Sequence, residues 1–553
     1  MLFQGKEEPI MKKWIPILLI LTLLCGCGSS TEPPAAEPHP EVADPVYGEI
    51  PHISRFYSET VITLSDSGIT LEGNEAAVYT SNDIIYYEDR EAYDSGNPYG
   101  EGADTDKHTA DEAAAHTVVN ITQPGAYRVT GKLSAGQIRI DLGEDAYEDE
   151  NAVVELILQD ADITCTVAPA VLFLNVYECD GDWSVDTAAS QVDTSAAGAR
   201  LILEGRNTVS GSYVAKIYKD KEGEKKLWKQ DGAIYSYMSL NVYGPGTLDL
   251  TAENEGLDSE LHLTINGGNI NIRSGNDGIN TNEDGVSVTT INAGSIHIIA
   301  GLGEEGDGID SNGYLVINGG TVVASANPAA DAGMDSDLGS YIHGGIVVAL
   351  GSTMDWAESD SQQVTMNLQF AHFQESSSAI VIAYPDGTVA FAYDPGQDEV
   401  LGENVRGYQG AVISTPNLQV GQSYHVYLGS AVDGTEAGGV YDVSTVTGFH
   451  GGTQMQYTGT DVGMGGPMPG GQMPEGIEDF TRPEGDFQIP EQPSVPENMP
   501  AGTGGTHGGQ RPEGMGGMPG GQRPEGMENP GGGNALFYMS DKVNAFSGVT
   551  AVN

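Results

Sequence analysis

Short runs rich in Val, Ile and Leu alternate with Gly, Asn and Asp turns from Phe56 to about residue 350. Examples are VITLS at 61–65, QIRIDL at 137–142 and VLFLNV at 171–176. Runs of this length and composition are typical of strands, and no segment sustains the 3.6-residue period of an amphipathic helix. The pattern therefore predicts an all-β body with few helices.

A short motif recurs at nearly constant intervals in the second half of this region. Its copies begin at Asn266, Asn292, Asn318 and His343, and the third residue of every copy is Gly. Those glycines are 26, 26 and 25 residues apart. Such a period holds two or three strands with tight corners, which is the size of one coil of a parallel β-helix (solenoid).

A second motif, in which an acidic residue and Gly usually precede an apolar residue and Asp or Asn, interleaves with the first. Its copies begin at Glu255, Asp277, Asp307 and Ala332. Stacked coils lie about 4.8 Å apart, so equivalent residues of successive coils form a column. We expect the apolar positions to form an interior column of Leu257, Ile279, Ile309 and Met334.

The segments after this body differ from it in composition. Residues 351–460 alternate again without the glycine motif, and we expect an irregular, β-rich C-terminal cap that protects the open edge. Residues 461–533 are of low complexity, rich in Gly, Pro, Met and Glu, and are predicted to be a disordered linker. Residues 534–553 regain a strand-like pattern and are expected to dock on the body. The lysine-rich stretch 216–230 is predicted to be an excursion loop.

The N-terminal region has the features of an export signal. Two lysines precede an apolar run at 14–24 that is too short to span a bilayer comfortably. The sequence LCGC at 24–27 resembles a bacterial lipobox, in which Cys27 would carry the lipid. We predict a lipoprotein signal peptide at 11–27, a Pro-rich tether at 28–55 and a body anchored at the extracellular face of the membrane. An ordinary secretory signal is the alternative.

The charge of the chain restricts its partners. Lys and Arg number 23 and Asp and Glu number 79, which gives a net charge of −56. A chain this acidic is not a nucleic-acid binder that works by neutralising phosphates. Repulsion among so many carboxylates opposes a compact fold unless cations bind some of them.

The second motif places acidic and amide side chains in register. The predicted metal ligands are Asp258, Asn280, Asp310 and Asp335, then Glu260, Asn282, Asn312 and Asp337 two positions later, and the leading Asp277 and Asp307. Oxygen atoms stacked in this way suit Ca²⁺, which takes six to eight oxygen ligands. Zinc is disfavoured because the chain has no His/Cys cluster. A solvated row of turns is the alternative, since Asp and Asn favour turns.

Several motifs together resemble those of a known family. They are GAYRVTGKLSAGQIRIDL at 125–142, VELILQDADITC at 154–165, LILEGRNTVSG at 201–211 and the DGIDSNG–INGG combination at 307–320. Over roughly residues 115–350 the chain resembles the carbohydrate-binding lipoproteins of anaerobic Gram-positive bacteria.

The resemblance implies a right-handed parallel β-helix, similar in fold to pectate lyases, that contains calcium and binds cellulose or polygalacturonate. The calcium ligands that it implies are Asp258, Asn280, Asp310 and Asp335, with Asp277, Asp307 and Asp337 in support.

We predict a non-catalytic cell-surface protein that binds polysaccharide, either an acidic, pectin-like glycan or a cellulosic one. Bound Ca²⁺ would bridge protein and uronate carboxylates. A neutral glycan would instead need exposed rings for stacking, and the candidates are Trp228, Tyr235, Tyr237 and Tyr243, each of which has core packing as its alternative role.

Two other functions compete with simple binding. One is a pectate-lyase-like polysaccharide lyase, and the other is a structural or adhesive surface protein. β-Elimination needs a base, normally Lys or Arg in such folds. Arg273 is the single Lys or Arg between residues 231 and 350, which disfavours the lyase.

Overall fold

The computed structural model describes eleven segments of the chain. They are residues 50–87, 108–181, 184–218, 225–226, 228–303, 305–352, 355–375, 378–398, 400, 406–461 and 533–552. The chain divides into two units, 1–41 and 42–553, and all described residues belong to the second. The predicted signal peptide with Cys27, most of the tether and nearly all of the low-complexity linker lie outside the described residues.

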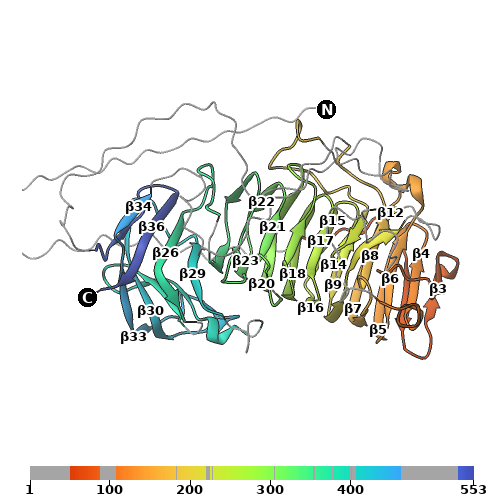
Figure 1. Ribbon diagram of the computed structural model, residues 1–553, viewed down its shortest axis with the longest axis horizontal. Helices are drawn as coiled ribbons and strands as arrows, with labels where there is room; N and C mark the ends of the chain where they lie inside the picture. The colour runs from red at the N-terminus through yellow and green to blue at the C-terminus, as the bar shows by residue number, and fades with distance from the viewer. Residues whose placement is uncertain are drawn as a thin grey trace, which may run out of the picture. The chain divides into compact units, whose positions relative to one another are not determined.

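One sheet contains eight strands that follow one another in chain order (Figure 1). They are β3 (Val78–Ser81), β4 (Thr117–Ile121), β6 (Gly136–Asp141), β8 (Val171–Asn175), β14 (Gly232–Ser236), β17 (Glu255–Ser259), β19 (Ile279–Thr281) and β21 (Ile309–Ser311). The pair β3–β4 is antiparallel, and every later neighbour pairs in parallel. Each passage of the chain therefore adds one strand to this sheet in the same direction.

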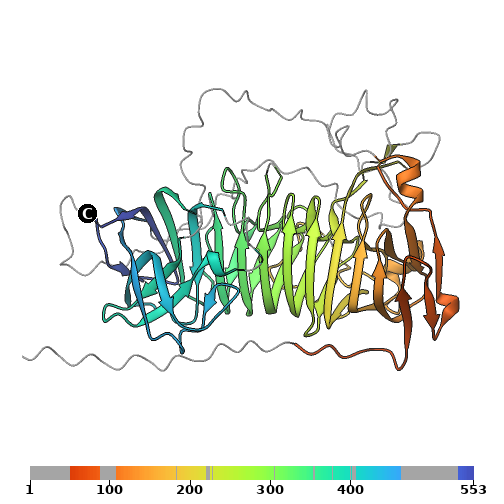
Figure 2. The same cartoon turned by 90° about the horizontal axis from the view of Figure 1, so that it is seen from below.

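A larger sheet contains two further rows of parallel strands. The first row consists of β1 (Glu59–Leu64), β5 (Gly125–Leu133), β7 (Val154–Thr164), β9 (Ala199–Glu204), β15 (Leu240–Tyr243), β18 (Leu263–Ser274), β20 (Val288–Ile299), β22 (Tyr314–Ile317) and β24 (Gly339–Ile342). The second row adds β10 (Arg206–Gly211), β16 (Thr247–Ala252), β23 (Thr321–Ser325) and β25 (Ile346–Gly351). The long strands β7, β18 and β20 contribute to both rows. Figure 2 shows these strands side by side.

Glycine is required where the chain passes from the first row to the second. Gly268, Gly294, Gly320 and Gly345 all have positive φ, between 82° and 104°. A Cβ atom on Gly294 would lie 2.8 Å from the carbonyl oxygen of Gly268, and one on Gly320 would lie 2.6 Å from that of Gly294. Left-handed backbone and close stacking of coils both exclude larger residues here, which explains the recurrent Gly of the first motif.

The interior of the rows is a continuous apolar core. Leu257, Ile279, Ile309 and Met334 are fully buried in one cluster, as expected for an interior column. Leu257 pairs with Ile279 and Ile279 with Ile309, so the column follows the strand register. The prediction of an all-β body is confirmed. The right-handed sense and the assignment as a parallel β-helix stay predictions.

After β25 the pairing becomes mainly antiparallel. The strands are β26 (Thr365–Gln374), β27 (Ile380–Ala383), β28 (Val389–Tyr393), β29 (Tyr408–Ser414), β30 (Ser423–Asp433), β31 (Glu436–Ala437), β32 (Val440–Tyr441), β33 (Gly448–Gln456), β34 (Gly459–Asp461), β35 (Phe537–Tyr538) and β36 (Val543–Ala551). The antiparallel pair β25–β29 extends the second row beyond β25. The C-terminal β36 pairs with β26 and β34 and packs Phe546 into a second core.

The remaining elements are small. A strand β2 (Thr70–Glu72) pairs with β1, and β11 (Val214–Tyr218), β12 (Lys225–Lys226) and β13 (Trp228–Gln230) form a separate sheet within the lysine-rich stretch. The helical segments are α2 (Ala110–Ala114), η1 (Glu75–Ala77), η3 (Glu144–Glu148) and η4 (Pro395–Gln397). In the described part of the chain no helix has the length and apolar character needed to cross a membrane.

Candidate cation centre and carbohydrate site

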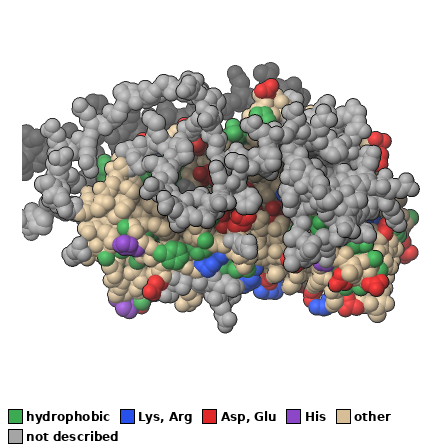
Figure 3. All heavy atoms as spheres, viewed as in Figure 1, with side chains coloured by type: hydrophobic (Ala, Val, Ile, Leu, Met, Phe, Trp, Pro, Cys, Tyr) green, Lys and Arg blue, Asp and Glu red, His purple; other side chains and the backbone are tan. Residues whose placement is uncertain are grey.

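The strand register brings three predicted ligands into one column. Asp258 on β17 pairs with Asn280 on β19, and Asn280 pairs with Asp310 on β21. Asp335 continues the column, because its amide donates to the carbonyl oxygen of Ile309 at 2.8 Å. Leu257 and Ser259, on either side of Asp258, are also buried. Because successive side chains of a strand point to opposite faces of the sheet, these two lie on the face opposite to Asp258. Acidic side chains are also visible near the middle of the face in Figure 3.

Three buried oxygen atoms on β17 and β19 receive no hydrogen bond from the described residues. They are Oε2 of Glu255, Oδ2 of Asp258 and Oδ1 of Asn280. The Asp258 side chain is completely buried, and those of the other two are nearly so. A buried acceptor without a donor is costly, more so when it is charged. These oxygens therefore have the chemistry of a cation site.

The carboxylates in and around the column repel one another strongly. Burial, and then the nearby carboxylate of Asp231, raises the pKa of Glu255 to about 7. Burial and repulsion from Glu255 raise the pKa of Asp258 well above its usual range. The pKa values of Asp277 and Asp310 are also raised, first by burial and second by neighbouring carboxylates. Protons or a bound cation must compensate so many buried carboxylates.

The leading residues Asp277 and Asp307 also have structural roles. Oδ1 of Asp277 accepts from the amide of Asp307 at 2.6 Å, and Oδ1 of Asp307 accepts from the amide of Ala332 at 2.5 Å. Each carboxylate thus ties one coil to the next with one of its oxygens. Burial, followed by repulsion from Asp335, raises the pKa of Asp307 to about 8.

The side chains two positions after the column form hydrogen bonds with other protein groups. Asn282 donates from Nδ2 to Oδ1 of Asp258 at 2.8 Å and accepts from Nδ2 of Asn280 at 3.0 Å. Nδ2 of Asn312 donates to the carbonyl oxygen of Asn282 at 2.9 Å. Glu260 accepts from the hydroxyl of Tyr235. Asn282 thus orients two members of the column. The roles of Asn282, Asn312, Glu260 and Asp337 as direct ligands stay predictions.

Two acidic residues of the region were not predicted as ligands. Glu255 leads its copy of the second motif as Asp277 and Asp307 lead theirs, so the repeat alignment contained the signal. Asp355 lies beyond the last copy, and burial with repulsion from Asp335 raises its pKa to about 7. Its Oδ2 accepts from the amide of Ser336 at 3.1 Å, a contact that no repeat indicates.

The residues present fit a hard cation held by mixed oxygen ligands. The described residues contain no group of three His, Cys, Asp or Glu side chains already arranged around one point as a metal site. Glu255 and Asp258 supply two carboxylates, and Asn280 supplies an amide oxygen. Carboxylates and amide oxygens, completed by backbone carbonyls and water, are what Ca²⁺ takes in proteins.

The aromatic candidates are not exposed platforms. Tyr235, Tyr237 and Tyr243 have exposed fractions of 0%, 2% and 9%. Sugar stacking needs an open ring face, so Tyr235 and Tyr237 serve as core residues, which was their alternative role. The side chain of Trp228 lies outside the described residues. Tyr243 borders a cavity that is described below.

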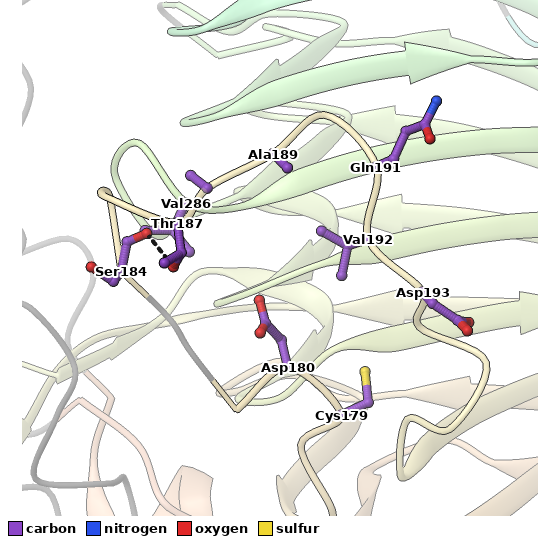
Figure 4. Close-up of a pocket in the computed structure, with 10 residues that line it drawn as sticks. Cys179, Asp180, Ser184, Thr187, Ala189, Gln191, Val192, Asp193 and Val286 are labelled. Atoms are coloured by element: carbon purple, nitrogen blue, oxygen red, sulfur yellow. Dashed lines mark hydrogen bonds between the residues drawn. The ribbon is translucent and has the colours of Figure 1, made fainter.

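Two neighbouring cavities lie on either side of the segment 190–193. The first has a volume of about 370 Å³, and its walls include Cys179, Asp180 and Val192 (Figure 4). Val192 points into it, whereas Gln191 and Asp193 point to the other side of the segment (Figure 4). Nδ1 of His262 accepts from the amide of Val288, so Nε2 carries the proton and donates to Asp180 at 3.1 Å.

The thiol in the first cavity is not activated. Burial and the adjacent Glu178 raise the pKa of Cys179. Cys165 is buried in the apolar core, and neither cysteine forms a disulfide. A nucleophilic cysteine needs a lowered pKa, so this cavity lacks the chemistry of a thiol-dependent active site.

The fold and these sites define an all-β protein of stacked parallel strands with an acidic column that is buried at Asp258 and Asn280 and half-buried at Asp310 and Asp335. Residues 115–394 match the model of the carbohydrate-binding domain-containing protein family. The chain belongs to this family.

Two known proteins are similar to parts of the chain. A carbohydrate-binding domain-containing protein of Acetivibrio thermocellus is 28% identical over 176 residues, which are 31% of this chain and 51% of that protein. The chain thus matches about half the length of this relative. A polysaccharide lyase-like protein from C. thermocellum, solved as a gadolinium derivative, aligns over 52% of this chain and 93% of its own, with 18% identity and a TM-score of 0.30.

Proposed function

We propose that this protein is a non-catalytic, cell-surface polysaccharide binder whose stacked rows form a right-handed parallel β-helix that contains Ca²⁺. Family membership supports carbohydrate binding. The parallel pairing of equivalent strands from successive repeats supports the β-helix.

The observation that carries the calcium proposal is the set of buried, unpartnered oxygens of Glu255, Asp258 and Asn280. Ca²⁺ bound there supplies positive charge that offsets the repulsion within the column. Where such an ion keeps an open coordination position, it also bridges to a uronate carboxylate. The proposed ligands are therefore acidic, pectin-like glycans or cellulosic glycans.

Gel electrophoresis in the presence of polysaccharide tests this function. The full chain is expected to be retarded by a suitable polysaccharide, and retardation by polygalacturonate is expected to disappear with a chelator because both polymers are anionic. The absorbance of a polygalacturonate solution with Ca²⁺ at alkaline pH is expected to stay flat. Absorbance that rises, and that Arg273→Ala abolishes, would establish a lyase. Unchanged mobility in every polysaccharide would favour a structural or adhesive role.

We also propose that the protein is a lipoprotein anchored through Cys27. Replacement of Cys27 by Ser is expected to move the protein from the membrane fraction to the medium, or to leave an unprocessed precursor, because a serine cannot carry the thioether-linked lipid. Metabolic lipid labelling and cell fractionation measure this, with Cys165→Ser as a matched control that should stay membrane-bound. Membrane attachment of Cys27→Ser together with no lipid label on the unaltered protein would contradict the proposal.

A further inference from the structure

The second cavity is a polar groove on the outer side of the first strand row. It has a volume of about 290 Å³ and is bordered by Thr264 on β18, Thr290 on β20 and Val316 on β22. These residues occupy equivalent positions of successive coils, since Thr264 pairs with Thr290 and Thr290 with Val316. The groove therefore follows the stacking direction, so that each coil contributes one step of about 4.8 Å.

A ladder of amides forms one side of this groove. Asn318 donates from Nδ2 to Oδ1 of Asn292 at 2.8 Å, and Asn292 donates in the same way to Asn266 at 2.9 Å. All three border the groove. Each amide of the ladder retains a second N–H and a second oxygen lone pair, so it can donate to and accept from a hydroxyl group.

The segment 190–195 forms the opposite side and is anchored to the strands. The hydroxyl groups of Thr194 and Thr264 hydrogen bond at 2.7 Å, and Nδ2 of Asn241 donates to the carbonyl oxygen of Thr194 at 2.6 Å. Nη2 of Arg200 donates to the carbonyl oxygen of Ser195 at 2.7 Å. A wall held in this way is ordered before any ligand binds, which reduces the entropic cost of binding.

Aromatic rings lie at both ends of the same face. Tyr243 borders the groove at the β15 end, where its ring lies 5.0 Å from that of His52. At the β24 end, Tyr341 pairs with Val316, and its ring lies 6.1 Å from the rings of Tyr314 and His343. Tyr314 and Tyr341 are partly exposed, so they can pack against the apolar face of a sugar ring.

The charge of the groove selects among glycans. Asp193 is the single charged side chain among the described residues that border it. A polyuronate would bring carboxylates toward this negative charge and into the field of a chain with a net charge of −56. A neutral polysaccharide has no such penalty, and its hydroxyl groups match the amides of the ladder and the partly exposed hydroxyl of Thr290.

We propose that this groove binds a neutral polysaccharide chain, which lies along the Asn266–Asn292–Asn318 ladder and stacks on the tyrosines of the β24 end. The inference rests on the proposed carbohydrate-binding function and names the site and the ligand class. It assigns neutral glycans to the groove and separates them from the acidic column.

Thr290→Arg in the full chain tests the site, because Thr290 is a partly exposed residue whose enlargement fills the groove without removing a core contact. Affinity electrophoresis with hydroxyethylcellulose, in chelator, is expected to show binding weakened about tenfold or more. Tyr341→Ala is expected to weaken it roughly three- to tenfold. The matched controls are Thr208→Arg, on the exposed face of β10, and Tyr79→Ala, on β3; both should bind normally. Thermal melts confirm that each variant is folded.

Asp193→Asn tests the ligand class. The affinity for hydroxyethylcellulose is expected to stay within about twofold of that of the unaltered protein, because an uncharged ligand is insensitive to the loss of the Asp193 charge. If the groove takes polyuronate instead, this variant strengthens retardation by polygalacturonate in chelator, which would overturn the assignment to neutral glycans. Normal hydroxyethylcellulose binding by folded Thr290→Arg would overturn the site and leave the proposed function standing. No retardation of the unaltered protein by any polysaccharide would refute both.

Discussion

Addition of Ca²⁺ to the metal-free protein is expected to raise its melting temperature, and the rise is expected to be larger at pH 8 than at pH 5. The pKa of Glu255 is raised to about 7, and burial raises that of Asp307 to about 8. The folded state holds these protons more tightly than the unfolded chain. The stability that they contribute is present at about pH 4 and lost as the pH rises through about 7–8.

Ca²⁺ replaces the lost protons as the compensating charge, so its effect grows as they leave. A site occupied at one hundred times its Kd adds about 2.7 kcal/mol to the free energy of unfolding. For a body of roughly 300–400 residues, with an unfolding entropy of about 2 cal/mol/K per residue, that corresponds to a rise of roughly 3–5 °C. Differential scanning calorimetry at the two pH values, with Ca²⁺ and with chelator, measures it.

Asp258→Asn distinguishes a metal site from a column with only a structural role, because Asp258, Asn280 and Asp310 lie in paired strands and not in the predicted turns. Removal of this buried carboxylate is expected to stabilise the metal-free protein at pH 8, because repulsion with Glu255 is lost, and to reduce the gain from Ca²⁺. Asp145→Asn, on the exposed η3 segment, is the matched control and should behave like the unaltered protein. Identical melting with Ca²⁺ and chelator at both pH values, together with no metal by elemental analysis, would show that the column has only a structural role.

Ile279→Ala is expected to lower the free energy of unfolding by about 2–5 kcal/mol. Ile279 is fully buried between Leu257 and Ile309 in the interior column. Its truncation removes apolar contacts with the coils on both sides and leaves a cavity that the short strand β19 cannot close. Chemical denaturation monitored by circular dichroism measures the loss.

The matched control for this prediction is Ile53→Ala. Ile53 is 83% exposed, so its truncation should change the free energy of unfolding by less than about 0.5 kcal/mol. An equally small change for Ile279→Ala would mean that successive repeats do not stack in the register described.

The stacking register was largely predictable from sequence. Copies of the second motif begin 22 and then 30 residues apart at Glu255, Asp277 and Asp307, yet the strands pair in the register of the motif. The turns take up the difference in length. Recurrent Gly marked the row-to-row corners for the same reason, because Gly294 and Gly320 have positive φ and close neighbours that exclude a side chain.

The groove was not predictable in this way. Its wall depends on contacts between Thr194 and residues 47 and 70 positions later in the chain. The segment 190–195 belongs to no repeat copy, so no internal periodicity indicates which strands it crosses. The same limit applies to Asp355, which reaches Ser336 from outside the repeats.

The sequence by itself determined which residues occupy equivalent positions, because a repeat and the two-residue pleat specify neighbours within and between coils. Those constraints are local, and they establish the columns of Leu257 and Asp258. Only the tertiary structure decided that Asp258 and Asn280 in this column are buried, that Tyr235 and Tyr237 are core residues and that amides border an open groove. Solvent exposure depends on which distant segments cover a face, and that is settled by the packing of the whole chain.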